Sequence, residues 1–217
     1  MPLSISTATE PTFEPVSLLE ARRHCRVTST EEDSTLQDMI KEAREWVEEY
    51  LGRTLMKTTY ALKVDAFPGV GWQLEEDGFR RGRDGTCFLV LPRPPLLSVS
   101  SVAYLDGDGA SQTLAATVYS VDTTSQPGRL SLAYGQSWPT TRAVPHAVTV
   151  TYVAGYSSSA VEATQQAAVP YRAKGAVKII LATLFAHRES FVTGTTASEL
   201  PFSAKQLLRP LRVLEAA

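Results

Sequence analysis

The sequence predicts an α+β protein, with a small four-helix domain built from both chain ends and an antiparallel β domain inserted between them. Apolar residues recur at helical spacing near the two ends of the chain. Between them lie short segments rich in β-branched and aromatic residues, separated by Gly, Pro, Asp and Ser. Their connections are too short for parallel crossovers, which favours antiparallel pairing. We expect a flexible N-terminal arm at 1–14, a helical domain at 15–53 and 168–217, and the β domain at 54–156.

The first predicted helix begins in "VSLLEARRHCR", at residues 16–26. Ser17 can cap it, and Glu20 three residues later can accept from the Ser17 amide, which is the pattern of a capping box. Val16 precedes the cap and can act as the hydrophobic staple.

The second predicted helix has the strongest signal in the chain and covers residues 29–51, with Ser29 or Thr30 as its cap and Gly52 at its end. Carboxylates crowd its first turn, where they meet the positive end of the helix dipole. Its apolar residues form one stripe, which predicts a buried face. The predicted packing residues on this helix are Leu36, Ile40, Trp46, Val47 and Tyr50.

Six segments are predicted strands, at 54–67, 87–91, 97–105, 117–122, 129–133 and 147–156. The glycine-rich segment 69–85 is expected to be a mobile loop. Asp106 to Gly109 predict a hairpin turn rather than a calcium loop, because the twelfth position of the pattern is Thr117 instead of an acid. The segment "LPRPPLL" at 91–97 could be a polyproline ligand, but its strand-like flanks favour a stiff connection between two strands.

The helical period returns at Pro170, which fits a first helical position. Ile180 and Leu184 belong to the apolar face of this predicted helix. Ser203 is expected to cap a short last helix, whose regular length is limited by Pro210.

Composition and motifs argue against an enzyme, a metal site and a cofactor site. The three histidines, His24, His146 and His187, lack partners at metal-ligand spacing, and no phosphate-binding or nucleophile motif is present. No apolar run is long enough to cross a membrane. Cys25 and Cys87 are far apart in sequence, and reduced thiols are favoured over a disulfide.

Charge is unevenly distributed, although the net charge is only −2. Residues 31–51 carry eight acids and two bases, whereas residues 170–217 carry seven bases and three acids. Such segments can pair within one copy or between copies. Arg80, Arg81 and Arg83 lie in the glycine-rich segment, where they could contact DNA phosphates or a partner, or could simply be solvated.

The order of several motifs resembles the head-to-tail connector, or adaptor, family of tailed bacteriophages, which is also found in phage-like particles. The opening "EPVSLLEARRHCRV" is similar to the family's short first helix, and the acidic second helix ends in a similar "YLGRTL". The segments "LPRPPLLSVSSVAYLDGDG", "VTVTYVAGY", "VPYRAKGAVKIILATLFAHRES" and "LPFSAKQLLRPLRV" follow in the family's order. The resemblance extends from about residue 14 to 214.

This resemblance implies a structural virion protein that is made in the host cytoplasm and located in the neck. The expected assembly is a homo-oligomeric ring, a dodecamer in the virion, beneath the portal protein. It would extend the channel for packaged DNA without sequence-specific binding and offer a docking platform to a tail-side stopper or tail-completion protein. No cofactor and no membrane are implied.

The family's C-terminal segment commonly docks on the portal, which implies a docking role here for Leu207, Leu208, Arg209, Leu211, Arg212 and Val213. The same residues could instead close the helical domain of their own copy. Truncation after Phe202 is expected to leave the fold largely intact. A competing hypothesis is a glycan- or peptide-binding module in the β domain, motivated by Trp72 and Trp138 as exposed aromatics.

Overall fold

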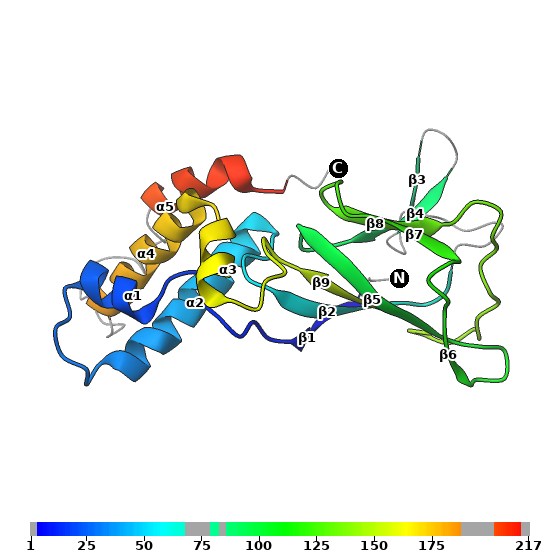
Figure 1. The fold of residues 1–217 in the computed structure, drawn as a ribbon, viewed down its shortest axis with the longest axis horizontal. Coiled ribbons are helices and arrows are strands. Elements are labelled where there is room, and N and C mark those ends of the chain that lie inside the picture. Colours follow the sequence, from blue (N-terminus) through cyan, green and yellow to red (C-terminus); the bar gives the residue numbers. More distant parts are fainter. Residues whose placement is uncertain (1–3, 68–78, 83–85, 188–201, 214–217) are drawn as a thin grey trace, which may run out of the picture. The chain divides into compact units, whose positions relative to one another are not determined.

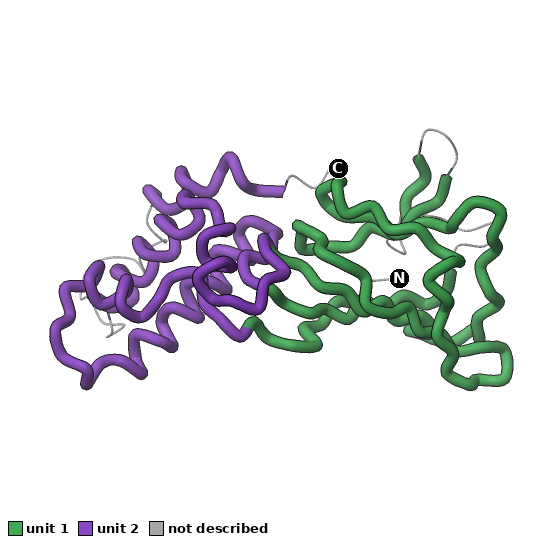
Figure 2. The backbone as a smooth tube through the Cα atoms, in the orientation of Figure 1, with its two compact units in different colours: residues 1–11, 57–155 green, residues 12–56, 156–217 purple. Residues whose placement is uncertain are grey.

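The computed structural model describes residues 4–67, 79–82, 86–187 and 202–213, and the ribbon in Figure 1 follows their path. The chain divides into two compact units (Figure 2). The sheet unit contains Met1–Pro11 and Lys57–Gly155, and the helical unit contains Thr12–Met56 and Tyr156–Ala217. The α+β class agrees with the sequence prediction.

The sheet unit consists of two antiparallel sheets. The five-stranded sheet has the order β1-β2-β9-β5-β6 and the four-stranded sheet has the order β3-β4-β8-β7. The strands are β1 (Ser4–Thr9), β2 (Thr58–Val64), β3 (Phe79–Arg81), β4 (Cys87–Leu91), β5 (Leu96–Leu105), β6 (Ser111–Thr113), β7 (Tyr119–Asp122), β8 (Gly128–Leu132) and β9 (Val148–Ala154).

The core of this unit follows from the two-residue period of its strands. In β2 and β9 alternate residues are buried, and the two strands pair in continuous register from Thr58–Ala154 to Val64–Val148. Tyr152 is fully buried and donates its hydroxyl hydrogen bond to the Pro92 carbonyl at 2.9 Å. That carbonyl lies in the proline-rich connection, so a strand of one sheet is tied to the segment that leaves the other.

The proline-rich segment connects two strands, as predicted, and these strands belong to different sheets. β4 ends at Leu91 and β5 begins at Leu96, and the segment between them contains a cis peptide bond at Pro94–Pro95. The predicted hairpin turn is also present, because Asp106 accepts from the amides of Asp108 and Ala110 between β5 and β6.

The helical unit contains α1 (Leu18–Cys25), α2 (Asp33–Leu51), α3 (Glu162–Ala168), α4 (Tyr171–Ala186), α5 (Phe202–Leu208) and a 3-10 turn at Arg209–Leu211. α4 packs against α1, α2 and α5. Its small residues Ala173 and Ala176 are fully buried, which lets the neighbouring helices approach closely. The predicted packing residues Leu36, Ile40, Val47 and Ile180 are buried, and Trp46, Tyr50 and Leu184 pack at the margin of the same core.

The ends of α1 and α2 agree with two capping predictions. Ser17 accepts from the Glu20 amide at 3.3 Å while Glu20 accepts from the Ser17 amide at 3.1 Å, which completes the capping box. Gly52 ends α2 at a φ of 63°, a backbone conformation that glycine adopts without the steric cost of a Cβ.

Three predictions about helix starts were wrong. α2 begins at Asp33 rather than after Ser29 or Thr30, because the Thr30 carbonyl accepts from the Asp33 amide in a turn before the helix. Pro170 is the residue before α4 rather than its first residue. Ser203 lies inside α5, which begins at Phe202, so it does not cap that helix.

Two larger predictions need correction. Residues 4–9 are not a flexible arm: they form β1, whose backbone pairs with β2 from Ser4–Lys63 onward. Hydrophobic periodicity missed this strand because most of its side chains are exposed. The helical unit has five α-helices rather than four in its described residues. The additional helix is α3, which was not predicted because its polar sequence has no apolar stripe.

One short strand, β3, was also missed, and it lies inside the segment expected to be a loop. The compact units differ from the predicted boundaries, because Thr54–Met56 and residues 156–167 fall in the helical unit. No disulfide joins Cys25 to Cys87.

Candidate functional site

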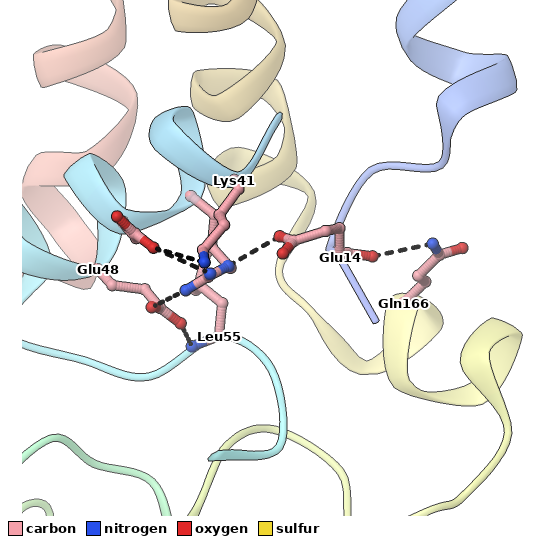
Figure 3. Close-up of polar contacts among 7 residues, drawn as sticks. Glu14, Lys41, Glu48, Leu55 and Gln166 are labelled. Atoms are coloured by element: carbon pink, nitrogen blue, oxygen red, sulfur yellow. Dashed lines mark hydrogen bonds and ion pairs between the residues drawn. The ribbon is translucent and has the colours of Figure 1, made fainter. Parts of the chain in front are cut away.

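A buried ionic network connects several segments of the helical unit (Figure 3). Arg44 of α2 is 3% exposed, and its guanidinium donates to Glu14 and to Glu48, each at 2.8 Å. The second oxygen of the Glu48 carboxylate accepts from the Leu55 amide at 2.6 Å. The Glu14 carbonyl accepts from Gln166 of α3 at 2.9 Å. The network therefore joins α2 and α3 to the segments at Glu14 and Leu55. Both segments are close in sequence to a boundary between the two units.

The charge balance of this network shifts the pKa values of its members. Burial raises the pKa of Glu48 and of Glu14, and the single guanidinium does not compensate two buried carboxylates. Burial alone would lower the pKa of Arg44, but Glu48 and Glu14 raise it, so the guanidinium stays charged. A buried ion pair of this kind positions segments, and nothing in its geometry suggests catalysis.

We find no clear catalytic or metal site among residues 4–67, 79–82, 86–187 and 202–213. No group of three or more His, Cys, Asp or Glu side chains in these ranges could hold a metal ion. His146 lies 4.0 Å from Asp65, and His24 is exposed at the end of α1. None of the described helices is long and apolar enough to cross a membrane.

The outer side of α2 presents a row of carboxylates, which we call the acidic face: Asp38, Glu42, Glu45 and Glu49. All four side chains are exposed. Their steps of four, three and four residues place them on one side of the helix, about half a turn from the buried stripe. Glu45 contacts Lys41 at 4.0 Å, and Arg44 at 3.4 Å. Among the described residues no cation pairs with the other three.

The C-terminal segment packs against its own helical unit. Leu208 is fully buried, Leu211 packs at the edge of the same core, and the Cδ1 atom of Leu207 lies 3.6 Å from where a Cβ on Gly175 would be. The sequence left two roles open for this segment, docking on the portal and closing its own helical unit. In the structure its apolar side chains pack on the core of their own helical unit. This burial argues against the expectation that truncation after Phe202 leaves the fold intact, because truncation would remove Leu208 from the core.

Backbone contacts also hold this segment. The Val213 amide donates to the Leu51 carbonyl at 2.9 Å, and Arg53 donates to the Leu211 carbonyl at 2.6 Å. Arg209 and Arg212 remain exposed, and we call these two side chains the basic edge.

The predicted basic loop is partly a strand. Arg80 and Arg81 are exposed residues of β3, paired with β4 through Phe88 and Cys87, whereas Arg83 lies outside the described residues. Placement on a strand restricts their backbone.

The aromatic residues that motivated a ligand-binding module do not form an exposed platform in the described chain. Trp138 is half-buried and stacks on Phe67, with ring centroids 4.6 Å apart and an interplanar angle of 6°. Phe67 also meets Tyr104 edge to face. Trp72 lies outside the described residues.

Sequence reasoning missed the Arg44 network. Its only local signal is that Arg44 and Glu48 fall within the apolar stripe of α2 and are four residues apart, so both side chains lie on the same helix face. Glu14 could not be assigned to the network, because its partner is 30 residues away in sequence.

The chain is thus an α+β protein of two compact units. Its most prominent polar features are the buried Arg44 network, the acidic face and the basic edge. Residues 15–71 match the family model described as phage gp6-like head-tail connector protein. This match confirms, for that part of the chain, the resemblance predicted from the sequence. No protein of curated function matches the chain in sequence.

Solved structures match over nearly the whole chain. A chain from the neck of an empty gene transfer agent particle, computed with C6 symmetry, has a TM-score of 0.70 and 20% identity, with 100% of this chain and 98% of that chain covered. A chain from the virion of the native particle has a TM-score of 0.70 and 18% identity, with 98% and 97% covered. A chain from the native neck, computed with C12 symmetry, has a TM-score of 0.65 and 19% identity, with 100% and 98% covered. At these identities the comparisons show a shared fold.

Proposed function

We propose that this protein is a structural component of the neck of a phage or phage-like particle, located between capsid and tail. The observation that carries the proposal is the fold likeness to neck chains over the full length of this chain. The family match at residues 15–71 supports it independently, because that match rests on sequence. In this role the protein is not an enzyme and needs no cofactor.

The proposed assembly is a ring that surrounds the DNA channel beneath a portal protein. Two of the similar neck structures were computed with C6 and C12 symmetry, which supports a cyclic arrangement and is compatible with the dodecamer expected in the virion. The ring would extend the channel and present a platform to a tail-side stopper or tail-completion protein. Two compact units suit two such contacts, because each can present its own surface.

Packaged DNA would pass through this ring without sequence-specific binding. The net charge of −2 supports weak interaction with the DNA backbone, since tight phosphate binding requires clustered cations. Arg80 and Arg81 on β3 are candidates for contact with DNA or a partner protein, because both side chains are exposed.

The test is coexpression of the full chain with the portal protein of the same particle, followed by electron microscopy of the purified complex. The expected result is a ring of this protein on one end of the portal, coaxial with its channel. The proposal is refuted if the two proteins, each shown to be folded, do not associate at any salt concentration or protein ratio. A particle in which this chain is found away from the neck would refute it equally.

A further inference from the structure

We propose that, within the ring, the acidic face of α2 in one copy binds the basic edge of the C-terminal segment in the next copy. This inference rests on the proposed ring and names the surfaces that close it. Both surfaces belong to the helical unit, so their relative position is fixed within one copy.

The first argument is the position of the acidic face. In a helix, residues separated by about 100° per step place Asp38, Glu42, Glu45 and Glu49 opposite the stripe that packs on the core. Among the described residues, Glu45 is the one member of this face that pairs with cations: with Arg44 at 3.4 Å, and with Lys41 at 4.0 Å between side chains that are more than half exposed. The face therefore presents three carboxylates without a local counter-charge in the part of the chain described.

The second argument is the position of the basic edge. Arg209 and Arg212 are exposed, and neither pairs with a carboxylate among the described residues. Arg212 lies over the Tyr50 ring, 5.3 Å from its centroid. Tyr50 follows Glu49 by one residue and so points about 100° away from it. Tyr50 packs at the margin of the core, which keeps Arg212 on that flank of α2 and away from the acidic face of its own copy.

The third argument is the arrangement of the helices. α4 packs against both α2 and α5, whereas Arg209 and Arg212 follow α5, and Arg212 reaches the flank of α2 that carries Tyr50. Each copy therefore has an acidic surface on one flank and a basic surface on another. A contact between two different surfaces is heterologous, and repeated heterologous contacts close into a ring when the rotation between copies allows it. Complementary charge would favour this orientation over an acid-to-acid contact.

The test uses two charge-reversed forms of the full chain. Variant A carries Asp38→Lys, Glu42→Lys and Glu49→Lys, so that three of the four positions of the acidic face become basic, and variant B carries Arg209→Glu and Arg212→Glu. In A alone both surfaces are basic and in B alone both are acidic, so each is expected to self-associate on the order of tenfold more weakly than the wild type, because like charges face each other. An equimolar mixture of A and B is expected to regain assembly, since both contacts in an alternating ring are again complementary.

Sedimentation velocity at low salt measures these assemblies, and circular dichroism verifies that each variant is folded. A control carrying Lys63→Glu and Arg172→Glu has the same charge change as variant B at other exposed positions, and it is expected to assemble like the wild type. The proposal is overturned if folded A and B each assemble normally, or if their mixture does not regain assembly.

A wild-type chain that stays monomeric at low salt and high concentration would also overturn this inference. Ring formation on a portal, as tested by electron microscopy above, would remain possible in that case. If instead variant A assembles normally and variant B fails only to bind the portal, the portal is the partner of the basic edge, and the contact between copies is refuted.

Discussion

Replacing Arg44 with methionine should destabilise the helical unit more than any other single loss of charge on α2. The substitution keeps an unbranched side chain of similar length but leaves the carboxylates of Glu14 and Glu48 without their shared cation. Arg44 donates two hydrogen bonds of 2.8 Å to them, and its own side chain is only 4% exposed. Removal of one partner from a buried pair costs about 3–5 kcal/mol, a large share of the roughly 5–15 kcal/mol that stabilises a typical domain.

The matched control is Lys41→Met on the same helix. Lys41 and Glu45 are 4.0 Å apart with side chains 53% and 54% exposed, so the loss should stay below about 0.5 kcal/mol. Urea denaturation followed by far-UV circular dichroism measures both variants, because all helices of the described chain belong to the helical unit. The double variant Arg44→Met, Glu48→Gln should recover part of the loss, since glutamine removes one buried charge and keeps an acceptor for the Leu55 amide.

The pH dependence provides a second check. The pKa values of Glu14 and Glu48 are raised above the ordinary 4.5 in the folded state, so the folded chain binds more protons than the unfolded chain between that value and the folded pKa. In this window the unfolding free energy contributed by these groups rises as pH falls. Without the Arg44 cation their pKa values rise further, so the loss caused by Arg44→Met should be larger at about pH 8 than at about pH 5. A loss under about 1 kcal/mol at the higher pH, or one that does not change with pH, would contradict the assigned role of Arg44.

Three further substitutions test other parts of the structure, each by the change in unfolding free energy from urea denaturation. Ser17→Ala removes the capping box of α1 and should cost about 1 kcal/mol, and an unchanged stability would show that the cap contributes nothing. Gly128→Ala would place a Cβ 2.5 Å from the Leu96 side chain and should cost about 1–3 kcal/mol, whereas Gly107→Ala, with no atom within 4 Å, should change stability by less than about 0.5 kcal/mol. Leu208→Ala opens a cavity in the helical core and should cost about 2–5 kcal/mol; a neutral result would favour a detached C-terminal segment.

The periodicity of apolar residues correctly predicted the helices that bury one face. α2 and α4 were predicted because their apolar residues recur on one face, and their central residues, including Ile40, Val47 and Ile180, are buried. The capping box at Ser17 was equally predictable, since all its atoms come from four consecutive residues.

Elements without a buried face were not predictable in this way. The side chains of β1 are mostly exposed, so its sequence shows no alternation, and its backbone is satisfied by β2, 50 or more residues away. α3 is short and polar, and its Gln165 and Gln166 are held by hydrogen bonds to Ser159 and Glu14. Similarly, the sequence showed charge asymmetry but could not say which of its acids and bases were buried together and which remained on the surface.

The sequence by itself determined the α+β class, the helices near the two chain ends, the principal strands and the resemblance to connectors. These features depend on periodicity, capping residues and motif order, which involve residues that are close together in sequence. Only the tertiary structure decided that Glu14 meets Arg44 and that Leu208 closes its own core. It likewise decided that Arg209 and Arg212 stay exposed, and that Asp38, Glu42 and Glu49 pair with no cation in the part of the chain that the structure describes. These outcomes depend on contacts between segments far apart in sequence, and the free energy of burial and charge pairing that selects among them exists only when those segments meet.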